Sequence, residues 1–252
     1  MDNTSWEKVD LWYDHLVGKE GHYYHKHVIF PALFPLLELN RFQDPALLDL
    51  ACGQGVLAHH LPPSISYYGV DLSPSLIKAA KEKKKKHHHF AVADICKPLS
   101  FNEESFTHAT LILALQNIAD PLTTFKETYR CLKDEGIFII VINHPCFRIP
   151  RQTHWEIDPS KKLQYRRVDA YLSPLKIPIQ VHPGQKGGKE VWAFHYPLSM
   201  ITRFLSAACF VIREIEEWTS DKKSSGAAAR MENRARKEFP LFLAIKAQKT
   251  VK

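Results

Sequence analysis

Acidic residues and a glycine turn recur at regular positions in the first half of this 252-residue chain. Asp49 lies inside an apolar run, which the turn Gly53-Gln54-Gly55 follows, and Asp71 and Asp94 each end a later apolar run. A glycine turn lets the backbone approach a ligand closely. A carboxylate can accept hydrogen bonds from ribose hydroxyls or from an adenine amino group. The spacing therefore predicts a site for a ligand that contains a nucleoside.

The apolar runs that carry these residues are typical of strands separated by helices. We expect strands at 47–50, 67–71, 90–94, 109–113 and 137–142, with a helix at 121–132 before the last of them. Strands this apolar are buried on both faces, and their alternation with helices predicts a parallel sheet with right-handed crossovers. Parallel strands end at one edge, so the acids should cluster there, where open α/β sheets bind ligands.

The composition changes after the fifth predicted strand. Residues 144–197 hold seven of the sixteen prolines and lose the helical periodicity, which indicates an insertion. Two strand-like runs, 177–181 and 191–195, predict a hairpin within it. Beyond the insertion we expect a helix at 198–208, a strand at 211–216 and a last strand at 241–247.

The glycine motif is similar to that of a known family. Residues 47–55, Leu-Leu-Asp-Leu-Ala-Cys-Gly-Gln-Gly, resemble the first motif of the class I S-adenosylmethionine-dependent methyltransferases. The likeness continues through 69–73, Ala93-Asp94 and a turn at 132–136, and it covers residues 40–142 well. It is strongest to the broad group that includes the methyltransferases of ubiquinone biosynthesis.

The resemblance implies a fold and a function. The fold would be doubly wound α/β, with a mostly parallel seven-stranded sheet in the order 3-2-1-4-5-7-6, an antiparallel last strand and a β-rich insertion after strand five. The chain would divide into an N-terminal helical lid at 1–40, a methyltransferase core at 41–143 and 198–252, and an inserted cap at 144–197. The implied activity is transfer of the methyl group of S-adenosylmethionine to a small-molecule acceptor.

The resemblance also assigns residues to the cofactor. The methionine part would contact Asp49, Ala51, Gly53 and Gly55, and the ribose would contact Asp71, with Leu72 beside it. The adenine would contact Asp94 and Ile95, and the methyl-donating side would contact Leu111 and Gln116. Tyr13 would close over the cofactor from an N-terminal helix. Ala51 replaces the family's first glycine, which is tolerated if its φ is negative. An NAD-binding domain is disfavoured, because Ala58 stands at the third glycine position and Asp49 would face a pyrophosphate.

The acceptor side offers candidates of two kinds. His144, directly after the fifth strand, and His195, at the end of the insertion, are candidate general bases, although a hydrogen-bonded structural histidine is the favoured interpretation of each. Guanidinium groups suit carboxylates and phosphates, so arginines in the insertion indicate either an anionic acceptor or solvated surface charge. These arginines are Arg148, Arg151, Arg166 and Arg167.

The charge of the chain leaves two other function classes open. Its formal net charge of +7 fits an RNA or protein methyltransferase as a first alternative, but no zinc module or RNA-binding motif accompanies the charge, which disfavours a nucleic-acid partner. The basic run at 78–89 is either a solvated helix face or a nucleic-acid patch. A non-catalytic regulator that binds S-adenosylmethionine is the second alternative.

The chain also indicates its compartment. The first residues lack the charge and the apolar region of a signal peptide, and the longest apolar stretches are too short to span a membrane. The five cysteines form no C-x-x-C pair, so the spacing signals neither a disulfide framework nor a metal site. We therefore expect a cytoplasmic protein with no membrane partner, whose oligomeric state the sequence does not indicate.

Overall fold

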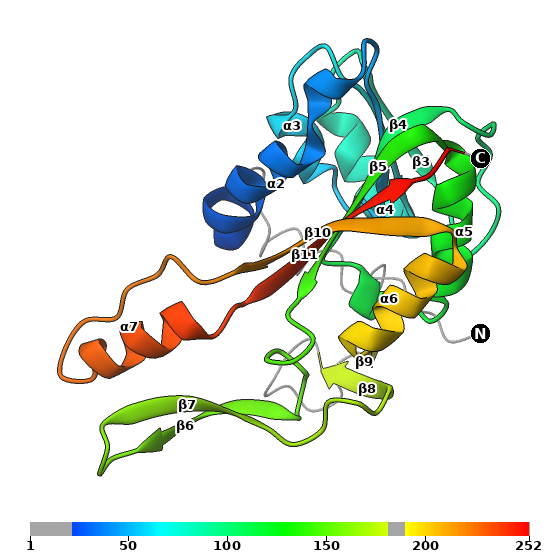
Figure 1. The fold of residues 1–252 in the computed structure, drawn as a ribbon. Helices are drawn as coiled ribbons and strands as arrows, with labels where there is room; N and C mark the ends of the chain where they lie inside the picture. Colours follow the sequence, from blue (N-terminus) through cyan, green and yellow to red (C-terminus); the bar gives the residue numbers. More distant parts are fainter. Residues whose placement is uncertain (1–21, 181–189, 252) are drawn as a thin grey trace.

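The computed structural model describes residues 22–180 and 190–251, and its centre is a seven-stranded sheet (Figure 1). The strand order is β3-β2-β1-β4-β5-β11-β10, and β11 runs antiparallel to both of its neighbours. Because β10 and β11 are the sixth and seventh core strands along the chain, this is the predicted order. The strands are β1 (Ala46–Leu50), β2 (Ser66–Asp71), β3 (His88–Val92), β4 (Phe106–Ile112), β5 (Leu132–Asn143), β10 (Phe210–Trp218) and β11 (Phe242–Lys249).

Both faces of the sheet are covered, which explains the unbroken apolar runs of the central strands. Along β5, Phe138 and Ile140 belong to one core cluster, whereas Ile139 and Val141 belong to another. The first cluster includes residues of α5 and α6, and the second includes residues of α2 and α3. The helical segments are η2 (His25–Ile29), α2 (Phe30–Leu37), η3 (Leu39–Arg41), α3 (Val56–His60), α4 (Pro74–Glu82), η4 (Leu115–Asn117), α5 (Pro121–Cys131), α6 (Leu198–Ala207) and α7 (Ala229–Glu238).

Two helices begin at side-chain caps close to strand ends. The Ser73 hydroxyl accepts a hydrogen bond from the Leu76 N–H at the start of α4, and Asp120 accepts one from the Thr123 N–H at the start of α5. In both helices a proline occupies the first helical position, where a missing N–H costs nothing. The cap of α4 therefore lies two residues after the end of β2, so this helix begins at the carboxyl edge of the sheet.

The inserted segment contains two antiparallel hairpins. The hairpin of β8 (Leu175–Gln180) and β9 (Glu190–His195) was predicted, whereas the hairpin of β6 (Thr153–Asp158) and β7 (Leu163–Val168) was not. The β8–β9 hairpin lies near the carboxyl edge, since β9 contacts η4 and the Tyr196 hydroxyl, next to β9, donates to the Ile118 carbonyl at 2.7 Å. The β6–β7 hairpin packs against α7 and extends away from the sheet (Figure 1). The predicted closure of this segment over a cofactor stays a prediction.

Two expected boundaries differ from the structure. The predicted turn at 132–136 is an irregularity inside β5, where Phe106 pairs with Leu132 but His108 pairs with Ile137. The basic run at 78–89 is not one helix face, because α4 ends at Glu82 and the run enters β3, where His88 is buried. Within the described residues, the helices are all too short or too polar to cross a membrane.

Candidate functional site

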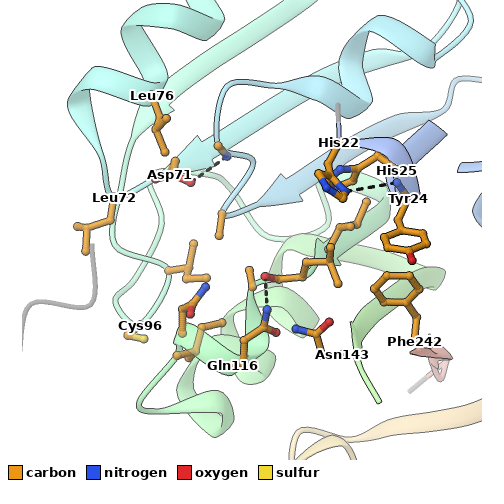
Figure 2. Close-up of a pocket in the computed structure, with 18 of the residues that line it drawn as sticks. His22, Tyr24, His25, Asp71, Leu72, Leu76, Cys96, Gln116, Asn143 and Phe242 are labelled. Atoms are coloured by element: carbon orange, nitrogen blue, oxygen red, sulfur yellow. Dashed lines mark hydrogen bonds between the residues drawn. The ribbon is translucent and has the colours of Figure 1, made fainter. Parts of the chain in front are cut away.

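A cavity of about 430 Å³ opens at the carboxyl edge of the sheet. Five consecutive core strands contribute to it: Gly53 follows β1, Asp71 ends β2, Asp94 follows β3, Gln116 follows β4 and Asn143 ends β5. Figure 2 shows Asp71, Leu72 and Cys96 at one end of the cavity and Tyr24, Asn143 and Phe242 at the other. The predicted convergence of the strand ends is therefore present.

Asp71 is held by backbone N–H groups from two loops. Its Oδ2 accepts a hydrogen bond from the Gly53 N–H, and its Oδ1 accepts one from the Ser73 N–H, both at 2.9 Å. These bonds fix the plane of the carboxylate at the wall of the cavity. Because a carboxylate has about four acceptor positions, Asp71 can accept hydrogen bonds from a ligand in addition to these.

The loop after β1 adopts backbone conformations that favour glycine. Gly53 and Gly55 have φ values of 56° and 76°, and a Cβ on Gly55 would lie 2.6 Å from the Phe90 ring. Ala51 has a φ of 53°, so the condition under which an alanine would be tolerated without strain is not met at this position. An alanine in this region costs roughly 1–2 kcal/mol, because its Cβ approaches the following carbonyl oxygen. The loop is therefore tight and locally strained at the wall of the cavity.

Asp94 and Ile95 line the cavity beside Asp71. The Cys96 N–H donates to Asp94 Oδ1 at 3.0 Å, and Lys97 forms an exposed ion pair with the other carboxylate oxygen. Ile95 is buried and gives this end an apolar wall. An apolar wall next to a fixed carboxylate is suited to a purine ring with an amino group.

Comparison with known proteins identifies the family. A family profile described as a methyltransferase domain matches residues 48–140. The 2-phytyl-1,4-naphtoquinone methyltransferase of Nostoc punctiforme is 30% identical over 173 residues, which cover 60% of this chain and 74% of that protein. The chain belongs to the class I S-adenosylmethionine-dependent methyltransferases.

Other relatives agree with this assignment. The ubiquinone/menaquinone biosynthesis C-methyltransferase UbiE of Geotalea uraniireducens is 29% identical over 128 residues, which cover 48% of this chain and 53% of that protein. The chain thus matches about half the length of that relative. The crystal structure of a S-adenosylmethionine-dependent methyltransferase from Mesorhizobium loti shares the fold, with a TM-score of 0.68, 24% identity and coverage of 87% of this chain and 97% of that one.

S-adenosylmethionine is the cofactor of this family, and the cavity fits it. Asp71, Asp94, Ile95 and Gly53 all line it. The contacts predicted for them with the ribose, the adenine and the methionine part stay predictions. The exposed Leu72 and the half-buried Cys96 lie at the rim of the same end (Figure 2).

Three residues predicted to meet the cofactor, Asp49, Gly55 and Leu111, do not line the cavity. Asp49 is buried and accepts hydrogen bonds from the Tyr67 hydroxyl at 2.6 Å and the Thr110 hydroxyl at 2.8 Å. It therefore connects β1 to both neighbouring strands, and burial raises its pKa to about 6. Leu111 is fully buried in the core, and Ile112 lines the cavity instead. The cofactor contacts predicted for Asp49 and Leu111 stay predictions.

The N-terminal segment contributes residues that the sequence analysis did not select. His22, Tyr24 and His25 line the end of the cavity that lies away from Asp94 (Figure 2). The Tyr24 ring packs edge-on against Phe242 of β11, with ring centroids 5.7 Å apart. The cluster of aromatic and histidine residues at 22–27 was the available signal. Tyr13, which was predicted to cover the cofactor, lies outside the described residues.

Two buried polar atoms in the cavity wall have no hydrogen-bond partner among the described residues: Oε1 of Gln116 and Nδ1 of His25. Gln116 donates through Nε2 to the Leu113 carbonyl at 2.6 Å, which directs Oε1 away from that bond. Burial, together with the neighbouring His22 and His60, lowers the pKa of His25 to about 4, so its ring is neutral near pH 7. An unsatisfied buried polar atom costs about 1–3 kcal/mol, which a ligand with matching groups would recover.

The two histidines predicted as general bases have protein partners and do not line the cavity. The Cys146 N–H donates to His144 Nδ1 at 3.2 Å, so Nε2 carries the proton and donates to Glu217 at 2.6 Å. His195 donates through Nε2 to the Tyr171 carbonyl at 2.6 Å. Burial lowers the pKa of both rings. Their predicted catalytic roles stay predictions.

Proposed function

We propose that this protein transfers the methyl group of S-adenosylmethionine to a small-molecule acceptor that binds in the same cavity. One observation carries the proposal: the cavity continues beyond the carboxylates of Asp71 and Asp94 to a second end, lined by Tyr24, Asn143 and Phe242 (Figure 2). A nucleoside held by the two carboxylates occupies the first end. The second end is then available for an acceptor, which argues against a regulator that only binds the cofactor.

The chemistry requires positioning more than reactive side chains. When bound, S-adenosylmethionine supplies a methyl group on a positively charged sulfur. Transfer of this methyl group would be an in-line displacement, so holding the two molecules in alignment would provide most of the acceleration. Asp71 and the Gly53 loop would hold the donor. Gln116 Oε1 would accept a hydrogen bond from either molecule where the two ends of the cavity meet.

The lining favours an aromatic acceptor. Tyr24, Phe242 and Leu241 give the second end of the cavity aromatic and apolar walls. Two of the relatives are named as a 2-phytyl-1,4-naphtoquinone methyltransferase and a ubiquinone/menaquinone biosynthesis C-methyltransferase. From this likeness we propose a phenol or quinol ring as the acceptor class. Arg148 is the one permanent cation among the described lining residues, whereas binding an RNA strand depends on several.

The proposal is tested by binding and by turnover. Calorimetry should detect S-adenosylmethionine and S-adenosylhomocysteine but not NAD. A radioactive methyl group should then be transferred to members of a panel of phenols and quinols, and not to tRNA or to unfolded protein. Binding of the cofactor without transfer to any of the three classes would support the regulator instead. Transfer to tRNA or protein alone would support the first alternative.

A further inference from the structure

Arg148 differs from the other arginines of the inserted segment by its position in the cavity wall. Arg167 is exposed and pairs with Asp169 and Glu156. Arg166 donates to the Phe147 carbonyl at 2.8 Å and to the Thr153 hydroxyl at 2.9 Å. For the Arg148 guanidinium, the described part of the chain provides neither a carboxylate nor a hydrogen-bond acceptor. Its charge is therefore available to a ligand.

The turn that carries Arg148 is anchored on both sides. The N–H groups of Phe147 and Arg148 donate to the His144 carbonyl at 3.2 and 2.8 Å, and the His144 ring donates to Glu217 of β10. The Phe147 carbonyl accepts the bond from Arg166. The backbone at Arg148 is thus held before any ligand arrives, which reduces the entropy lost when the guanidinium is ordered.

The charges of the cavity are separated between its ends. Asp71 and Asp94 lie at the nucleoside end. Arg148 lies at the other end, because its N–H donates to the carbonyl of His144, next to Asn143, and its guanidinium interacts electrostatically with Tyr24. The Arg148 side chain is exposed, like those of Arg151 and Arg167, but the protein around its guanidinium lowers its pKa, and its charge contributes to lowering the pKa of Arg166. Two neighbouring guanidinium groups create a positive potential at this end. An anion in the cavity would be attracted to Arg148 and repelled from the carboxylates.

We propose that the methyl acceptor carries an anionic group, a carboxylate or a phosphate, and that Arg148 binds it at the end of the cavity away from Asp94. This inference rests on the proposed function, because it assigns the second end of the cavity to the acceptor. The guanidinium fork can donate two parallel hydrogen bonds to a carboxylate or phosphate. Tyr24 and Phe242 would contact the ring that carries the anionic group. Binding at Arg148 would orient the opposite side of the acceptor toward the methyl donor.

The test uses the full chain saturated with S-adenosylhomocysteine and three probes of similar shape: benzoate, phenyl phosphate and the neutral benzamide. Affinities are measured by calorimetry at low salt for the wild type, Arg148→Gln and the matched control Arg151→Gln. Arg151 is an exposed arginine of the same segment that does not line the cavity. The difference between benzoate and phenyl phosphate shows which anion the site prefers.

We expect at least one anion to bind the wild type about tenfold more tightly than benzamide, and Arg148→Gln to remove this preference, because hydrogen bonds to charged groups are worth about one factor of ten or more in affinity. Arg148→Gln should leave the affinities for benzamide and S-adenosylhomocysteine within about twofold, and Arg151→Gln should behave as the wild type.

Three results would overturn the inference. The first is equal binding, or no binding, of the anions and benzamide by the wild type. The second is an unchanged preference for the anion in Arg148→Gln. The third is a loss of affinity for S-adenosylhomocysteine in Arg148→Gln, which would assign Arg148 to the cofactor's own carboxylate. Failure of the wild type to bind S-adenosylhomocysteine at all would instead contradict the proposed function.

Discussion

The backbone N–H of Gly53 donates a hydrogen bond to the Asp71 carboxylate at 2.9 Å, which joins the loop after β1 to the end of β2. The carboxylate predicted to bind the ribose therefore also holds the loop predicted to meet the methionine part. A cofactor bound to both elements would contact two parts of the protein that are already connected. Substitution of Asp71 should thus affect the cofactor directly and through the loop.

The first prediction concerns this carboxylate. S-adenosylmethionine, and not NAD, should raise the thermal midpoint of the wild type, and Asp71→Ala should abolish most of this increase. Hydrogen bonds to a charged acceptor are worth about 1.5–3 kcal/mol each, so the affinity should fall at least about tenfold by calorimetry. Asp44→Ala, which removes an exposed aspartate before β1, is the control. Unchanged cofactor binding in Asp71→Ala would contradict the assignment of the ribose site.

The second prediction is a pH dependence that comes from Asp49. Burial raises its pKa from 3.8 to about 6, so the folded state binds this proton more tightly than the unfolded state. The contribution of Asp49 to the free energy of unfolding should therefore be largest below about pH 4 and fall as the pH rises to about 6. Two pKa units correspond to about 3 kcal/mol. Asp49→Asn should lack this fall in urea unfolding measured between pH 4 and 7.

The control for this series is Asp44→Asn, which removes an exposed carboxylate and leaves Asp49 in place, so the fall in stability due to Asp49 should remain. An Asn at position 49 keeps one carbonyl acceptor, and its amide can donate to the Thr110 hydroxyl, so the variant is expected to fold. Parallel curves for the wild type and Asp49→Asn would show that the carboxylate is not desolvated.

The third prediction compares two positions of positive φ in one loop. Gly55→Ala should destabilise the protein by about 2 kcal/mol or more, because the new Cβ adopts an unfavourable φ and meets the Phe90 ring. Ala51→Gly relieves the same kind of strain, which stabilises the folded state, but it also increases the entropy of the unfolded chain, which opposes this gain. The free energy of unfolding should therefore equal that of the wild type or exceed it by up to about 1 kcal/mol. Urea unfolding measures both. A loss of stability in Ala51→Gly would place that residue outside the left-handed region.

The fourth prediction concerns His25. Its pKa is lowered from 6.5 to about 4, so the folded state binds this proton less tightly than the unfolded state and stability is lost as the pH falls below about 6.5. His25→Phe removes both this penalty and the unsatisfied Nδ1. The variant should gain about 1–2 kcal/mol over the wild type at pH 5, and less at pH 7.5. Weaker binding of cofactor or acceptor should accompany the gain, since the lost atom lines the cavity.

His27→Phe is the control for this series, because His27 is an exposed histidine in the same segment and does not line the cavity. This variant keeps His25, so the loss of stability at low pH that is due to His25 should remain. If His25→Phe loses stability at both pH values, the ring makes contacts in the folded state that outweigh its desolvation.

Local patterns in the sequence were sufficient for much of the sheet and for one end of the cavity. The apolar runs predicted β1, β2, β4 and β5, because strands covered on both faces need continuous burial. Asp71, Asp94 and the Gly53 turn were found for a related reason. Each stands at a strand end, and in a parallel sheet that position alone brings a residue to the shared edge.

The β6–β7 hairpin, by contrast, has mixed polar and apolar residues and packs on α7 rather than in a core, so its burial pattern contains little signal.

Pairing of β1 with both β2 and β4 surrounds Asp49 with Tyr67 and Thr110 and so takes it out of the cavity wall.

The other end of the cavity depended on contacts between distant parts of the chain. Tyr24 and Phe242 meet across most of the sequence, and the anchor of His144 on Glu217 sets the turn that brings Arg148 into the same wall. Spacing along the chain carries no information about such pairs, because they form only when β11 inserts between β5 and β10. The sequence by itself therefore determined the family fold and the end of the cavity that Asp71 and Asp94 line, and the tertiary structure decided which side chains form the opposite end.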